Sequence, residues 1–159
     1  MVDAEEIVKL LEELISVKLQ ATEVCTRCLG CRSYLSTDRT LAVAPEGTWE
    51  EKKSRGQYTE IDLADLEPEI VKYGTETEHK VLYLKYRYRK PVYNPLSKNT
   101  VTEVSYKAEL VLAAAYIIKK LYNRLHVYVN TEEVAPLIIR PNKLGENKDY
   151  EIIVAPRIA

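Results

Sequence analysis

All three cysteines of the chain lie within seven residues. Cys25, Cys28 and Cys31 occur in the stretch EVCTRCLGCRSY and follow a C-x2-C-x2-C spacing. Thiolates bind zinc and iron–sulfur clusters, and two-residue spacers let neighbouring thiolates turn toward one centre. The spacing therefore indicates a metal site. Zinc is the expected metal, and an iron–sulfur cluster is the less favoured alternative.

A closed zinc site takes four protein ligands, so the three cysteines need one more. The only histidines in the chain, His79 and His126, are the expected sources of the fourth ligand, although both are distant in sequence. The bacterial iron–sulfur run would need a cysteine at position 35, which is Leu35. The alternatives are one disulfide with a spare thiol, or three buried thiols.

A second candidate site is the segment 80–90, KVLYLKYRYRK, which holds five basic residues and no acidic one. Side chains alternate along a strand, so the odd-numbered residues share one face. Basic side chains bind phosphates and an aromatic ring stacks on a base, which predicts an interface for DNA or RNA. The alternative is a solvated face whose cations pair with Glu103 or with acids of the first half. The residues expected to bind are Tyr83, Lys85, Arg87, Arg89 and Lys90.

A metal-dependent nuclease is a third hypothesis. Asp62, followed sixteen residues later by Glu78, His79 and Lys80, has the residue types of a D…E-x-K nuclease. That chemistry places the carboxylate and the lysine on a buried strand beside a divalent ion. Here Glu78 follows the polar stretch TET and precedes the hydrophobic strand, so the sequence favours a protein without enzymatic activity.

The composition indicates a folded intracellular protein. With 159 residues, 46% hydrophobic and 30% charged, the chain has enough apolar side chains for a single domain with its own core. Glutamine occurs only at positions 20 and 57 while glutamate and lysine are abundant, as in hyperthermophile proteins, including those of archaea. The acidic first twenty residues do not resemble a signal peptide, so we expect a cytoplasmic location.

The two halves of the chain carry opposite charge. Residues 1–79 hold 9 basic and 17 acidic side chains, whereas residues 80–159 hold 14 basic and 7 acidic ones. This asymmetry predicts either an anionic partner for the basic half or packing of the two halves against each other. We expect one domain over 1–159, in which the acidic N-terminal half (1–79) contains the cysteine-rich loop and the basic C-terminal half (80–159) carries the sheet.

Hydrophobic periodicity predicts an α+β fold with a mainly antiparallel sheet. We expect an amphipathic N-terminal helix over 3–20 and a long central helix over 106–125 that packs on the sheet. Residues 45–57 are predicted to form a loop, and residues 65–68 to begin a short helix that ends at Gly74. The expected strands are 80–89, 100–105, 126–130, 134–140 and 150–155.

The central helix is apolar on all sides in its middle, and the stretches 137–139 and 152–154 do not alternate. Such elements need cover on both sides. We expect a two-fold homodimer that buries the C-terminal sheet or the helix 106–125 to supply this cover. The alternative is that the N-terminal helix alone covers these elements. Taken together, the patterns favour a non-enzymatic nucleic-acid-binding or accessory protein. The alternative is a protein–protein adaptor or structural assembly protein.

If Cys25, Cys28 and Cys31 bind zinc, metal binding contributes to the free energy of folding. We then expect elemental analysis of protein purified without added metal to find zinc, and a chelator to lower the melting temperature. A disulfide would give the opposite pattern. The chelator would have no effect, a reductant would destabilise the protein, and the mass would lie about two hydrogens below the reduced value.

Overall fold

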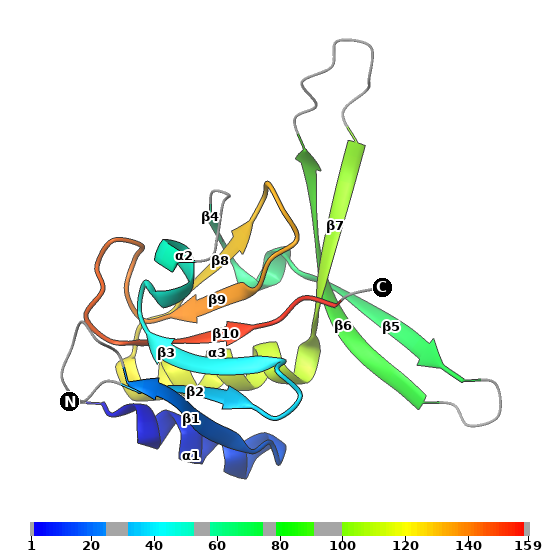
Figure 1. Ribbon diagram of the computed structural model, residues 1–159. Coiled ribbons are helices and arrows are strands. Elements are labelled where there is room, and N and C mark those ends of the chain that lie inside the picture. Colours follow the sequence, from blue (N-terminus) through cyan, green and yellow to red (C-terminus); the bar gives the residue numbers. More distant parts are fainter. Residues whose placement is uncertain (1, 25–31, 53–57, 75–78, 91–99, 158–159) are drawn as a thin grey trace.

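The computed structural model describes residues 2–24, 32–52, 58–74, 79–90 and 100–157 (Figure 1). Cys25, Cys28 and Cys31 lie outside these residues. The described elements are α1 (Ala4–Ile15), β1 (Leu19–Val24), β2 (Arg32–Ser36), β3 (Leu41–Pro45), α2 (Thr48–Lys52), β4 (Tyr58–Ile61), the 3₁₀ helix η1 (Leu63–Asp65), β5 (Glu67–Tyr73), β6 (His79–Lys90), β7 (Thr100–Lys107), α3 (Ala108–Tyr122), β8 (His126–Asn130), β9 (Leu137–Arg140) and β10 (Tyr150–Val154).

The strands form two antiparallel sheets, so the predicted α+β class is confirmed. One sheet has seven strands in the order β1-β2-β3-β10-β9-β8-β4, and the other has three in the order β5-β6-β7. All pairs recorded between the described strands are antiparallel. The large sheet is not confined to residues 80–159, because β3 of the first half pairs with β10 of the second.

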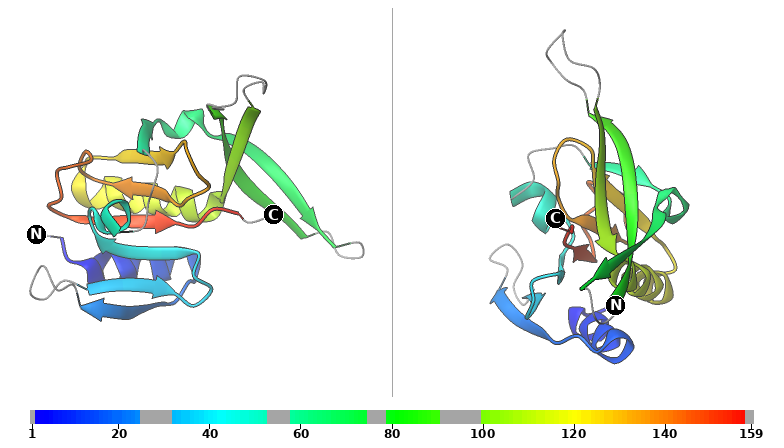
Figure 2. Two further views of the ribbon diagram at one scale, coloured as in Figure 1. Left: turned by 45° about the horizontal axis from the view of Figure 1, so that its top comes forward. Right: turned by 90° about the vertical axis from the view of Figure 1, so that its right-hand side faces the viewer.

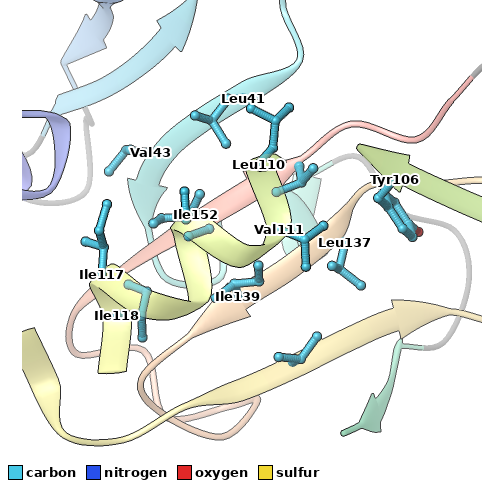
Figure 3. Close-up of a cluster of buried hydrophobic side chains, with 14 of the residues drawn as sticks. Leu41, Val43, Tyr106, Leu110, Val111, Ile117, Ile118, Leu137, Ile139 and Ile152 are labelled. Carbon is cyan, nitrogen blue, oxygen red and sulfur yellow. The ribbon is translucent and has the colours of Figure 1, made fainter. Parts of the chain in front are cut away.

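Both faces of the central strands are covered, as their lack of alternation predicts. Ile139 and Ile152 point into the main core beneath α1 and α3, whereas Ile138 and Ile153 belong to a smaller cluster beside Trp49 of α2. Figure 3 shows side chains of α3 packing on β3, β9 and β10 in the main core. The cover therefore comes from within the chain, with α1 and α3 on one face of the sheet and α2 on the other (Figures 1 and 2).

The three-stranded sheet projects from the body of the molecule as a twisted arm (Figures 1 and 2). The long strand β6 pairs with β5 along its first half and with β7 along its second half. Tyr88 of β6 and Val104 and Tyr106 of β7 are buried in the main core. The Tyr106 hydroxyl also donates a hydrogen bond of 2.8 Å to the carbonyl oxygen of Ala135. These side chains anchor the arm to the body.

The N-terminal helix is shorter than the predicted 3–20. It ends at Ile15, because Ser16 adopts a left-handed conformation with φ 53°, and residues 19–24 continue as β1. The apolar residues after Ser16 fit a helical stripe as well as a strand, so periodicity alone does not separate the two. The central helix is confirmed in type and spans 108–122 rather than 106–125.

The predicted short helix from residue 65 is wrong. A single 3₁₀ turn, η1, ends at Asp65, and residues 67–73 form β5 on the edge of the arm. Pro68 is tolerated at this edge because a strand at the border of a sheet needs no backbone donor on its outer side. The predicted loop 45–57 also contains a helix, α2, of five residues.

Candidate functional site

The strand predicted to bind nucleic acid has the expected two faces. Leu84, Tyr86 and Tyr88 pack on the main core, whereas the odd-numbered residues of β6 lie on the opposite side of the arm. We call this second side the outer face. Its acidic, basic and tyrosine side chains come from all three strands, and Arg157 of the C-terminal segment joins them. They are Glu67, Glu69, Tyr73, Tyr83, Lys85, Arg87, Arg89, Glu103, Lys107 and Arg157.

Arg87 is paired with acids of both neighbouring strands. Its Nε lies 2.9 Å from Oε1 of Glu103 on β7 and 3.9 Å from Oε2 of Glu67 on β5. The side chains of Arg87 and Glu103 are 52% and 47% exposed, so solvent screens the pair, which contributes about 0–1 kcal/mol to stability. The predicted pairing across the hairpin with Glu103 is therefore present, and it neutralises one of the expected binding cations.

Tyr83 has partners on its ring and on its hydroxyl. The guanidinium carbon of Arg157 lies 5.1 Å from the centre of the Tyr83 ring. The Tyr83 hydroxyl lies 2.9 Å from that of Tyr73, and this hydrogen bond raises the pKa of Tyr83. The backbone N–H of Arg157 donates to the carbonyl oxygen of Ser105 at 2.7 Å, which fixes the C-terminal segment against β7. Arg157 thus adds a cation to the outer face and covers a ring expected to stack on a base.

Three further cations of the outer face lack such acidic partners. Within the described part of the chain, no ion pair joins Lys85, Arg89 or Lys107 to a carboxylate. Arg89 and Lys107 are exposed and Lys85 is half-exposed. Lys90 is the last residue of β6, and its side chain lies outside what the structure describes. The cations best placed to meet an anion are therefore Lys85, Arg89 and Lys107.

The two histidines occupy different parts of the fold. His126 begins β8, and its Nδ1 contacts Oε1 of Glu60 on β4. His79 begins β6 and pairs with Tyr73. The paired ends of β1 and β2, which bracket residues 25–31, lie at the other end of the molecule from the start of β6 (Figures 1 and 2). Among the described residues, no three histidine, cysteine, aspartate or glutamate side chains gather to hold a metal ion.

The residues of the nuclease hypothesis also have local roles. The Asp62 side chain accepts a hydrogen bond from the backbone of Asp65, and the Asp65 side chain accepts one from the backbone N–H of Asp62. This reciprocal pair caps η1. Glu78 lies outside the described residues, and His79 and Lys80 begin β6.

A buried charged cluster lies at one end of the large sheet, where β3 and β9 end and β10 begins. The sequence analysis missed this cluster. Arg140 is fully buried, and its Nε lies 3.0 Å from Oε2 of Glu46, which is also fully buried. Arg140 Nη1 lies 3.5 Å from Oε1 of Glu151 and 3.9 Å from Oε1 of Glu50. Glu50, on α2, is the most exposed of the four at 14%. A solute in water has little access to these groups, which indicates a structural cluster.

The Glu46–Arg140 pair organises the turn 141–149 that joins β9 to β10. Glu46 accepts hydrogen bonds from backbone N–H groups of the turn, at Asn142, Lys148 and Asp149. Arg140 donates hydrogen bonds to acceptors of the same turn, which are backbone carbonyl oxygens and one side-chain amide oxygen. These acceptors belong to Asn142, Lys143, Glu146 and Asn147.

The other two carboxyl groups of the cluster have altered acidity. Burial raises the pKa of Glu50, and burial together with the neighbouring charge of Glu50 raises the pKa of Glu151 well above its usual range. Glu151 Oε1 accepts a hydrogen bond of 3.1 Å from the backbone N–H of Gly47. A single arginine cannot neutralise three buried carboxylates, so the fold favours a protonated Glu151.

None of the known protein families, curated proteins or solved structures compared with this chain matches it. In the described residues, no helix has both the length and the apolar character needed to cross a membrane.

We expect substitutions of the two fully buried glutamates, Glu151 and Glu46, to have opposite effects on the melting temperature. The Glu151 pKa is raised in the folded state, so its protonated form stabilises the fold below the ordinary pKa of 4.5, and this stabilisation is lost as pH rises through the folded-state pKa. Glu151→Gln keeps an acceptor for Gly47 and stays neutral. We expect similar melting temperatures for this variant and wild type near pH 4.5, and a higher one for the variant at about pH 8, by roughly 2–4 °C per kcal/mol.

Glu46→Gln is the matched comparison. It breaks the buried ion pair and turns a donor toward backbone N–H groups, so we expect a loss of about 3–5 kcal/mol at both pH values. Thermal unfolding followed by circular dichroism across this range measures both variants. Equal destabilisation by Glu151→Gln at every pH would mean that Glu151 is ionised in the fold.

Proposed function

We propose that this protein is a non-enzymatic nucleic-acid-binding protein that contacts the phosphate backbone through the outer face of its arm. The observation that supports this proposal most is the charge of that face. Five cations accompany three acids there, although the whole chain has a net charge of −1. The cations are Lys85, Arg87, Arg89, Lys107 and Arg157, and the acids are Glu67, Glu69 and Glu103.

The shape of the arm favours the same conclusion. A sheet that projects from the body presents its outer face without obstruction from the large sheet, so a polyanion can follow the strands (Figure 1). Because Arg157 covers Tyr83, the proposal rests on phosphate contacts rather than on base stacking. Binding of this kind has little sequence specificity and weakens steeply as counterions compete at rising salt.

A double charge reversal, Lys85→Glu with Arg89→Glu, tests the interface. Fluorescence anisotropy with single- and double-stranded oligonucleotides should show wild-type binding at low salt and its steady loss as salt rises. The variant should bind about 10- to 100-fold more weakly and show a salt slope smaller by about 2, one for each lost phosphate contact. Lys9→Glu with Lys18→Glu, an equal charge change at exposed residues of the N-terminal region, is the control. If both variants lose binding equally, net charge and not the arm is responsible.

The Arg87–Glu103 pair gives a prediction of increased affinity. Glu103→Gln removes the acid 2.9 Å from Arg87 and frees this cation for a phosphate. We expect binding to become about threefold to tenfold tighter, with a salt slope larger by about 1. Arg87→Ala in the wild-type background should change affinity little. A large loss with Arg87→Ala and no gain with Glu103→Gln would contradict this assignment.

A protein–protein adaptor is the second candidate, because the arm also carries exposed apolar side chains. Ile70 of β5 and Leu82 of β6 are directly opposite each other and are 64% and 42% exposed. If no oligonucleotide binds even at low salt, the adaptor function is favoured. A zinc-stabilised cysteine segment and a cytoplasmic location are further proposals that rest on the sequence alone.

A further inference from the structure

The outward side of α3 carries a stripe of exposed residues with a regular order of charge. The helix buries most of its side chains, including Val111, Ala114 and Ile118, against the main core. We call the remaining exposed side the α3 stripe. It begins with an acid, has two large apolar residues in the middle and ends with two lysines and an asparagine. Its members are Glu109, Leu112, Tyr116, Lys119, Lys120 and Asn123.

Two large apolar side chains in the middle of the α3 stripe are more than half exposed. Leu112 is 53% exposed and Tyr116 is 57% exposed, and these residues lie one helical turn apart on the same side. The acid in the first turn and the lysines in the last turn also suit the helix dipole. Lys120 Nζ lies 5.8 Å from the centre of the Tyr116 ring, so this tyrosine has one partner inside the stripe. Neither this contact nor the dipole accounts for the exposed Leu112 beside it.

The α3 stripe is complementary to itself when two copies run antiparallel about a two-fold axis. If the axis passes at the level of Ala114, Leu112 of one copy is level with Tyr116 of the other. The same register places Glu109 level with Lys119, because both pairs are symmetric about position 114. At 1.5 Å per residue, each acid lies about 7.5 Å along the axis from the centre and meets the lysine of the partner helix. In this one register, the apolar side chains contact each other and the opposite charges form pairs.

We propose that the α3 stripe is a homodimer interface in which two α3 helices pack antiparallel. This proposal is independent of nucleic-acid binding, since the outer face of the arm contributes no residue to it. A two-fold contact repeats each interaction, giving two Leu112–Tyr116 contacts and two Glu109–Lys119 pairs. One exposed stripe per copy buries less than the roughly 800 Å² per partner of a standard interface. The dimer is therefore weak and depends on concentration.

Sedimentation equilibrium of the full chain over a range of concentrations tests the dimer. Wild type should shift from monomer to dimer as concentration rises, and Leu112→Asp should raise the dissociation constant by about tenfold or more, since it buries a charge in the contact. Ile70→Asp, at an apolar side chain of the arm that is 64% exposed against 53% for Leu112, is the matched control and should dimerise like wild type. Monomer at all concentrations, or loss of the dimer with Ile70→Asp but not with Leu112→Asp, would overturn the proposal.

A charge swap tests the register of the two helices. Glu109→Lys and Lys119→Glu should each weaken the dimer by about threefold to tenfold, because each places like charges opposite one another. The double variant restores two opposite-charge pairs and should dimerise almost like wild type, even though its charges now oppose the helix dipole. Circular dichroism melting checks that each variant is folded. A double variant weaker than both single variants would refute the antiparallel register.

Discussion

The ion pair between Glu46 and Arg140 is the interaction on which the arrangement of the large sheet depends. The two residues follow β3 and end β9, which lie on either side of β10, so their contact closes one end of three adjacent strands. A fully buried guanidinium is costly unless its donors find acceptors. Here the acceptors are the Glu46 carboxylate and the carbonyl oxygens of the turn 141–149. The pair therefore fixes the course of the turn and the register of the strands together.

The body formed by this sheet also determines where the two proposed surfaces lie. β7 runs directly into α3 at Lys107 and Ala108, so the arm and the helix share one junction. Tyr106 lies at this junction and is fully buried, with its hydroxyl bonded to the carbonyl oxygen of Ala135. A change in this anchor would alter the outer face of the arm and the α3 stripe together, although they serve different proposed contacts.

The sequence predicted the elements whose periodicity is strong and local. Strand β6 alternates over its whole length, and the apolar stretches 137–139 and 152–154 indicated strands covered on both faces. The end of the N-terminal helix, which was predicted at residue 20, and the stretch 67–73 were misjudged, because a short amphipathic stretch fits a helix or a strand and only pairing with another strand decides. The buried cluster was missed for the same reason. Glu46 and Arg140 are far apart in sequence, and neither has a local pattern that announces a partner.

The structure gives a physical account of the opposite charges of the two halves. Glu46 and Glu50 approach Arg140, Glu67 approaches Arg87, and Glu60 contacts His126, so acids of the first half meet bases of the second within the chain. Internal neutralisation therefore explains some of the asymmetry without any partner. It does not reach the cations Lys85, Arg89 and Lys107 on the outer face, which have no acid within ion-pair distance in the described part of the chain. An anionic partner is therefore proposed only for these side chains, which is why the arm, rather than the basic half as a whole, is the proposed interface.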